Sequence, residues 1–159
     1  FGQYAHSNQP VHHVLYLYAF AGAAHSTQCC VRRVLNDLYP PQGFSGDEDN
    51  GEMASWYIFS ALGFYPFCPG HPSYVLGSPL FKKATVHLPS GKELIIEAPS
   101  NDAENIYVQE VEVDGAAHPA ADIAHQVLAS GCILRFAMAD QPADNPCAPE
   151  HLPFSLSIK

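Results

Sequence analysis

The stretch that decides the fold runs from Gly46 to Gly63 and reads GDEDNGEMASWYIFSALG. Its first part places four carboxylates within six residues, and it is flanked by glycines. Its second part carries apolar side chains around almost the whole circumference of a helix, which is typical of a buried helix. We therefore predict a helix from about Asn50 to Gly63, entered through an acidic loop at residues 46–52.

Two more helices are predicted on the N-terminal side of this stretch. Residues 11–24 are apolar nearly all round, so we expect a buried helix there. A second helix is expected to begin at Ser26, a good N-cap residue, and to place Arg32 and Arg33 on its outer face. The prolines at positions 40 and 41 end it.

The pattern changes at the prolines 66, 69 and 72, after which short runs with alternating polarity predict strands. We place a domain boundary there, with a helical part at 1–72 and a β-rich part at 73–159. The predicted fold class is α+β, with helices first and an antiparallel sheet second. After an irregular stretch at 140–153 we expect a short strand at 154–158. The main strands are expected at residues 74–76, 84–88, 93–97, 106–113 and 132–138.

Composition narrows the classes of function. The chain has 159 residues, 47% of them hydrophobic and 14% charged, which is typical of a folded protein. With 7 Lys and Arg against 16 Asp and Glu, a nucleic acid or an anionic membrane is a poor partner. No nucleotide-binding or serine-hydrolase motif is present. The chain begins at Phe1 without an initiator methionine, and we expect a piece of a longer protein.

The acidic loop has a structural and a chemical interpretation. Asp49 or Asn50 can cap the following helix, and Glu52 complements its dipole, but capping uses only one or two of these groups. An EF-hand is excluded, because counting from Asp47 its glycine and glutamate positions hold Glu52 and Ile58. A carboxylate cluster placed for general-base or metal chemistry is the other interpretation.

A second polar group stands at Asn8, Gln9, His12 and His13, before a segment that is otherwise apolar. Polar groups at the mouth of a buried helix must find hydrogen-bonding partners. The two histidines are interpreted either as ordinary buried side chains or as ligands. The other seven histidines and the five cysteines show no metal-binding spacing.

Taken together, these residues resemble glycoside hydrolase family 92. The resemblance is carried by residues 46–57, continuing through 59–66 and 68–70, and it extends upstream to Asn8-Gln9-Pro10 and downstream to 74–81 and 104–107. Members are calcium-dependent, inverting, exo-acting α-mannosidases. The resemblance implies that this chain corresponds to the last helices of an (α/α)6 barrel and the C-terminal sheet that follows, with upstream domains of the same polypeptide as partners.

The resemblance also implies roles for particular residues. Asp49 matches the catalytic base, with Asp47 beside it, whereas the general acid of the family lies upstream of Asn8 and has no counterpart here. The family commonly has Asn-Glu-Pro where this chain has Asn8-Gln9-Pro10, and we expect Asn8 and Gln9 to bind Ca²⁺. We expect Glu48, Trp56, His12 and His13 to contact substrate.

The expected substrate is terminal mannose of N-glycans or mannan, and the expected location is secreted or periplasmic. The chain alone is expected to be inactive, because half of the catalytic pair is missing. Two alternatives stay open. The chain is a non-catalytic module that binds carbohydrate or calcium, or it is a structural remnant with an exposed apolar helix face.

Overall fold

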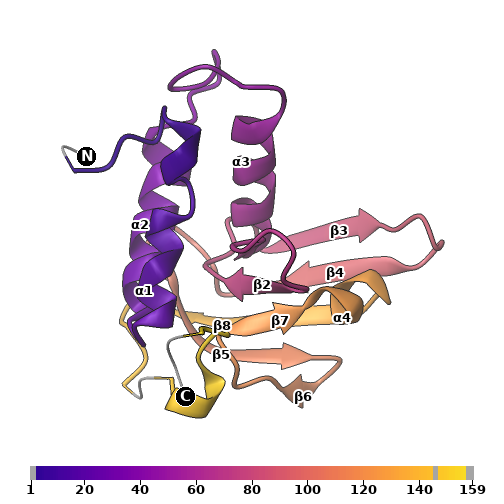
Figure 1. Ribbon diagram of the computed structural model, residues 1–159. Helices are drawn as coiled ribbons and strands as arrows, with labels where there is room; N and C mark the ends of the chain where they lie inside the picture. The colour runs from indigo at the N-terminus through magenta and orange to yellow at the C-terminus, as the bar shows by residue number, and fades with distance from the viewer. Residues whose placement is uncertain (1–2, 145–146, 157–159) are drawn as a thin grey trace.

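Helices come first along the chain and strands second, which confirms the predicted α+β class (Figure 1). The computed structural model describes residues 3–144 and 147–156. None of the helices in this part of the chain has the length and hydropathy that a membrane span requires. The helical elements are η1 (Gln9–Val11), η2 (Val14–Tyr16), α1 (Leu17–Phe20), α2 (Ala24–Asp37), α3 (Glu52–Leu62), α4 (His125–Ala129) and η3 (Pro149–His151).

The first predicted helix is broken into short pieces. Residues 9–20 form two 3-10 turns and one α-helical turn, and the chain leaves the helix at Gly22, which has φ 73°. Only one face is buried, since Leu17 and Tyr18 are each 45% exposed. An all-round apolar pattern does not distinguish α-helix from 3-10 turns, so the prediction of one long buried helix was wrong.

Helix α2 corrects a second expectation. It begins at Ala24, before the predicted cap at Ser26. Arg32 does not face solvent but is 4% exposed, because this face of α2 packs against loops of the β-rich part. Its Nη1 donates to the backbone oxygen of Pro79 and to Asn101 Oδ1, each at 2.5 Å, and Nη2 donates to the backbone oxygen of Asp102 at 3.0 Å. Arg32 therefore joins the helices to the sheets.

The strands form two sheets, of three and five strands, in the orders β1-β2-β7 and β3-β4-β8-β5-β6. All pairings are antiparallel except that of β4 with β8, so the larger sheet is mixed. The unpredicted strands β1, β6 and β7 are two or three residues long, too short for a detectable alternation. The strands are β1 (Phe64–Tyr65), β2 (Ser73–Leu76), β3 (Lys83–His87), β4 (Glu93–Glu97), β5 (Tyr107–Val113), β6 (Ala116–Ala117), β7 (Asp122–Ala124) and β8 (Ile133–Ala139).

The predicted strands fall close to their expected positions, and β4 coincides with residues 93–97. At the end of the chain, residues 154–156 form no strand, and the remainder of the predicted strand, 157–158, lies outside the described residues. Strand β1 lies on the N-terminal side of the predicted boundary at 72 and pairs with β2 on the other side, so the two parts share a sheet.

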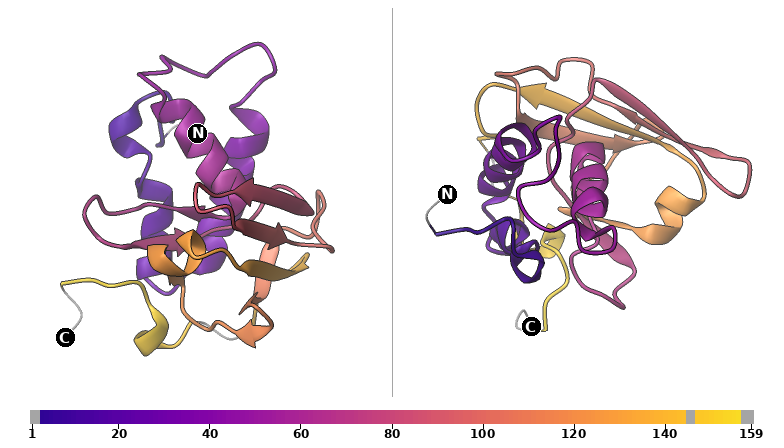
Figure 2. Two further views of the ribbon diagram at one scale, coloured as in Figure 1. Left: turned by 90° about the vertical axis from the view of Figure 1, so that its right-hand side faces the viewer. Right: turned by 90° about the horizontal axis from the view of Figure 1, so that it is seen from above.

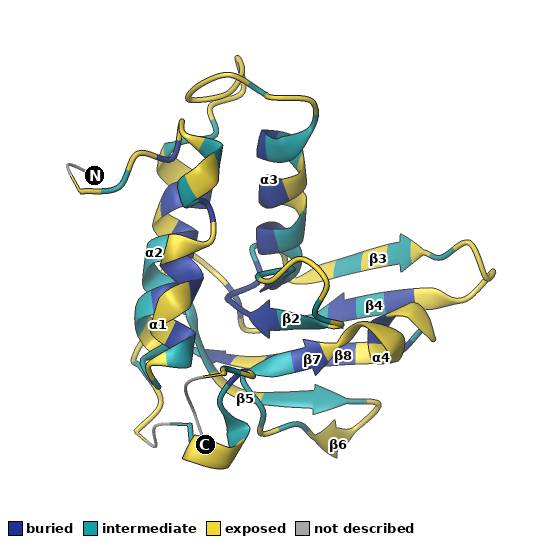
Figure 3. Cartoon of the chain, in the orientation of Figure 1, coloured by how far each residue is buried: buried dark blue, intermediate teal, exposed yellow. Residues whose placement is uncertain are grey.

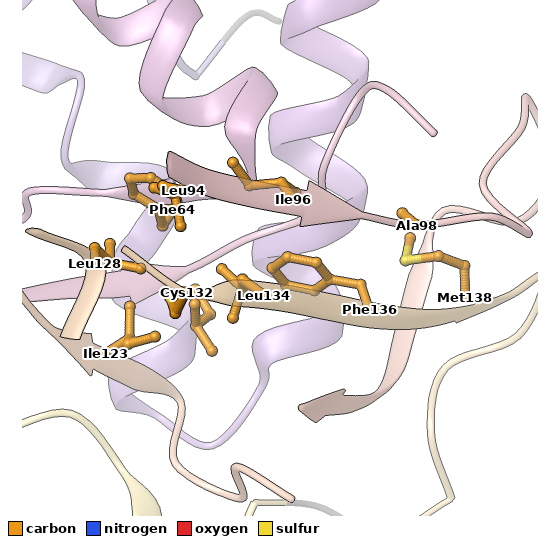
Figure 4. Packing of buried hydrophobic residues seen from close by; sticks show 11 residues of the cluster. Phe64, Leu94, Ile96, Ala98, Ile123, Leu128, Cys132, Leu134, Phe136 and Met138 are labelled. Carbon is orange, nitrogen blue, oxygen red and sulfur yellow. The ribbon is translucent and has the colours of Figure 1, made fainter. Parts of the chain in front are cut away.

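The apolar core has two clusters. Buried positions, dark blue in Figure 3, lie both in the helical part and along the strands. One cluster joins the two sheets and includes the alternate residues Leu134, Phe136 and Met138 of β8 (Figure 4). The other packs the helices on one another and on β2, with Tyr16 and Trp56 fully buried in it. The alternation along β8 shows one face buried and the other exposed, as expected for a sheet with one face on the core.

The segment between α2 and α3 lies outside these two clusters, at the end of the helices that is farthest from the sheets (Figures 1 and 2). The N-terminal segment runs to the same end of the helical part (Figure 1). The fold therefore brings both polar groups that the sequence singled out to one end of the molecule.

We predict that Arg32→Met lowers the free energy of unfolding by about 3 kcal/mol, because it leaves buried carbonyl oxygens without their charged donor. The neighbouring Arg33→Met is the matched control. Arg33 forms an exposed i,i+4 pair with Asp37 at 3.5 Å, and its loss is expected to cost at most about 0.5 kcal/mol. Urea unfolding of both variants measures the difference, and equal effects would contradict the role of Arg32.

Candidate active site

The acidic loop and the N-terminal polar group are in direct contact. The Gln9 amide nitrogen donates to the backbone oxygen of Asp47 at 2.6 Å. At Gly46 an added Cβ would lie 2.6 Å from Ser7 Cβ and 2.9 Å from the Ser7 backbone oxygen, so only glycine permits this close approach. The two groups, 38 residues apart in sequence, form one site.

Glu48 caps helix α3. Its carboxylate accepts hydrogen bonds from the backbone N–H of Gly51 and, at 3.2 Å, from that of Ala54. Asp49 and Asn50, which the sequence offered as possible caps, do not perform this capping, because the longer side chain of Glu48 reaches the free N–H groups from outside the helix. Both carboxylate oxygens of Glu48 thus serve the helix, and its contact with substrate stays a prediction.

Asp47 and Asp49 are exposed, and no hydrogen bond or ion pair engages their carboxylates among the residues that the structure describes. The backbone at Asp49 and Asn50 is left-handed, with φ of 58° and 59°, and Gly51 follows with φ of 98°. Asp and Asn tolerate this region better than other residues, but each such position costs on the order of 1–3 kcal/mol. The loop therefore holds two solvent-facing carboxylates beside the positive end of the α3 dipole in a strained backbone.

His12 lies beneath this loop and is 1% exposed. Its Nε2 is 2.9 Å from the backbone oxygen of His6, which can only accept, so Nε2 carries a hydrogen and donates. Its Nδ1 is 3.2 Å from Glu52 Oε1. This second contact is a hydrogen bond when a proton lies between Nδ1 and Oε1.

The His6 ring stacks on the His12 ring, and the hydrogen bonds of His6 fix the tautomer of His6. Tyr39 donates its hydroxyl hydrogen to the Met53 backbone oxygen at 3.1 Å, so it accepts from His6 Nε2 at 2.7 Å. His6 Nδ1 then accepts from the Tyr4 hydroxyl at 2.8 Å. The ring is neutral in this arrangement. Burial, together with the charge of His12, lowers the pKa of His6 to about 3.

No sequence pattern singles out His6 or pairs Glu52 with His12. The Tyr39 and Glu52 contacts join residues that are 33 and 40 positions apart. No local pattern signals such pairs. The one available hint was the general rule that polar groups beside a buried helix need partners.

Trp56 has no exposed surface, and its indole N–H donates to the backbone oxygen of His12 at 3.1 Å. Trp56 and His12 support the site from within, and both also line the cavity that His13 borders, so their contact with substrate stays a prediction. His13 is exposed, and its ring meets the edge of Phe67 with centroids 5.8 Å apart. It borders a cavity of about 310 Å³ whose other lining residues include Gln9, Glu52, Ser55, Tyr65 and Phe67.

The residues near the loop offer part of the ligand set that calcium requires. Asn8, Gln9, Asp47 and Asp49 offer oxygen atoms, which are the ligands that Ca²⁺ prefers. Gln9 uses its amide nitrogen on Asp47, which leaves its Oε1 for a cation. Within the described part of the chain, no three His, Cys, Asp or Glu side chains gather closely enough to hold a metal ion. The donor chemistry fits calcium, but the six to eight ligands it takes would need further oxygens.

Comparison with known proteins agrees with the resemblance seen in the sequence. Residues 1–140 match the family described as glycosyl hydrolase family 92 catalytic domain. An uncharacterized secreted glycosidase of Arthroderma benhamiae is 25% identical over 156 residues, which cover 94% of this chain and 20% of that protein.

Solved structures are similar over nearly the whole chain. A family GH92 inverting mannosidase from Bacteroides thetaiotaomicron is 43% identical with a TM-score of 0.89, covering 97% of this chain and 21% of that one. A family GH92 α-mannosidase from the same organism is 33% identical with a TM-score of 0.94, covering 98% and 22%. The latter enzyme has also been solved with mannoimidazole. The chain therefore spans about a fifth of the length of these relatives.

The pKa of His6 is about 3 in the folded protein, whereas that of a histidine in the unfolded chain is about 6.5. Between these two pH values the His6 ring is protonated in the unfolded state and neutral in the folded state. Stability is therefore lost as the pH falls through this window, by up to about 1.4 kcal/mol per pH unit. In His6→Gln, whose amide can accept from Tyr4 and donate to Tyr39, we expect a smaller loss. Urea unfolding at several pH values measures this slope. His25→Gln, at an exposed position, is the control, and equal changes in both variants would contradict the assignment.

Proposed function

Because the chain belongs to glycosyl hydrolase family 92, we propose that it supplies the catalytic base of an inverting exo-α-mannosidase that releases terminal mannose from N-glycans or mannan. The observation that carries this proposal is the pair of exposed carboxylates, Asp47 and Asp49, held on a strained loop at the start of α3. The names of the solved relatives, which are mannosidases, support the choice of substrate.

Inversion requires two carboxyl groups about 6.5–9.5 Å apart, one to protonate the leaving oxygen and one to activate water on the opposite face of the sugar. Asp49 takes the proton from water, and Asp47 beside it completes the base site. Neither carboxylate is held by another side chain of the described residues, so both are available to a water molecule. The general acid comes from the part of the enzyme that corresponds to the other four-fifths of the relatives' length.

Calcium is part of the proposal, and Asn8 and Gln9 would hold it with their side-chain oxygens. When bound, a hard cation at this place supplies Lewis-acid contacts to sugar hydroxyls. The chain's own residues orient the site, since Gln9 fixes Asp47 through its backbone oxygen. We also propose a secreted or periplasmic location, which the secreted relative supports.

We predict that Asp49→Asn in the full-length enzyme lowers kcat about 10²- to 10⁴-fold without loss of folding, because an amide cannot accept the proton of water. Mannose release from an unactivated mannobioside measures this. Asp37→Asn, which changes an exposed carboxylate in the Arg33 pair, is the control and keeps the parent rate. Near-parent turnover by Asp49→Asn would exclude the base assignment.

We predict that residues 1–159 alone release no mannose from the same mannobioside, because the general acid is missing. Measurable release would show that the acid lies within this chain. Calorimetry on the same sample with Ca²⁺ and mannose addresses the alternative of a non-catalytic module. Tight binding of both ligands, with an inactive full-length protein, would favour that alternative.

A further inference from the structure

We infer that Glu52 and His12 are positioning residues that hold the backbone of the acidic loop, residues 46–52, in place. The inference rests on the proposed function, since it concerns the loop that carries Asp49. It assigns a role to Glu52 that differs from those of Asp47 and Asp49: Glu52 acts through its contact with His12 and through the backbone that leads from it to Asp49.

The loop is attached to the N-terminal segment at both of its ends. At its start, Gln9 donates to the Asp47 backbone oxygen at 2.6 Å. At its end, Glu52 contacts His12 Nδ1 at 3.2 Å. Both partners come from residues 9–12, a single 3-10 turn and the residue that caps it. One short segment therefore holds both ends of the loop.

His12 is the fixed member of its pair. Its second ring nitrogen is bonded to the His6 backbone oxygen at 2.9 Å, and its ring stacks on that of His6 with centroids 4.4 Å apart. Its own backbone oxygen accepts from Trp56 at 3.1 Å. Glu52, in contrast, has a side chain that is 44% exposed. The buried histidine thus determines where the exposed glutamate lies.

The backbone between the attachments needs such restraint. Asp49 and Asn50 have positive φ, a conformation that is costly for residues other than glycine and persists only where the surroundings impose it. Glu52 follows after Gly51, and its backbone N–H bonds to the Asp49 oxygen at 3.4 Å. A displacement of Glu52 therefore reaches the Asp49 backbone through one hydrogen bond and three peptide units.

The chemistry of the pair indicates which substitution preserves it. Since His12 Nε2 already donates to a carbonyl, a neutral His12 presents a lone pair at Nδ1. The amide of Glu52→Gln can donate a hydrogen to this lone pair and keep the contact. In Glu52→Ala the contact is lost. Glu52→Asp retains the negative charge at the first residue of α3 but withdraws the carboxylate from His12.

The test measures kcat and KM for mannobioside in the full-length enzyme. We expect Glu52→Ala and Glu52→Asp to lower kcat about 10- to 100-fold, with KM changed by less than about threefold, because a misplaced base slows the chemical step. Glu52→Gln should restore most of kcat. Parent kcat in Glu52→Ala, or a Glu52→Gln variant as slow as Glu52→Ala, would overturn the inference.

The matched control is Glu93→Ala. It removes another His–Glu contact, His87 Nδ1 to Glu93 Oε1 at 3.0 Å, which lies on the β3–β4 hairpin with both side chains exposed. It should leave kcat and KM unchanged. Melting temperatures of all variants report folding, and the Glu52→Asp variant keeps the test decisive if Glu52→Ala does not fold.

A second readout does not depend on activity. The N–H groups of Gly51 and Ala54 hold the Glu48 carboxylate in the docked loop, so a glutamate-specific protease should cut after Glu48 more slowly there than in a loosened loop. Cleavage at Glu48 should therefore be faster in Glu52→Ala than in the parent and in Glu52→Gln. Equal cleavage rates would overturn the inference. The proposed function fails separately, if Asp49→Asn keeps its turnover while Glu52→Ala still loosens the loop.

Discussion

The site depends on one constraint, which is that the polar groups buried between the N-terminal segment and the start of α3 must all be paired. His6, His12, Tyr39 and Trp56 meet this constraint with hydrogen bonds to one another. Tyr39 also donates to the Met53 backbone oxygen. In a setting of low dielectric constant, an unpaired member would be costly, which favours the fully paired arrangement. The acidic loop contacts this network through Glu52 and His12, so its position depends on the network.

The residues that support the site differ in burial from the residues that are proposed to react. Groups that hold the site are buried and fully engaged, with Trp56 and His12 at 0% and 1% exposure. Groups proposed to react, Asp47 and Asp49, are exposed and free of side-chain partners among the described residues. Glu48 and Glu52 lie between these classes: one caps α3, and the other contacts His12. The four carboxylates of the acidic loop therefore differ in role according to the contacts that each one makes.

The helical part is in turn fixed to the sheets. Arg32 donates from α2 into the loops at Pro79, Asn101 and Asp102, and Asn101 also donates to the backbone oxygen of Leu80 at 2.8 Å. At the other end of α3, Gly63 turns the chain into β1 at a place where a Cβ would lie 3.2 Å from Phe136. The sheets therefore act as a base on which the helices, and with them the loop, are held.

The sequence by itself determined the α+β order, the extent of α3, the main strands and the acidic loop that leads into α3, because these depend on local periodicity and composition. Its family resemblance was confirmed, whereas the roles of Asp47, Asp49, Asn8 and Gln9 stay predictions. Tertiary structure decided the burial of Arg32, the breaking of the first helix, the capping by Glu48 and the pairing of His12 with Glu52. These features depend on contacts between residues distant in the sequence, or on the choice among several carboxylates of equal local propensity, and only the packed chain makes that choice.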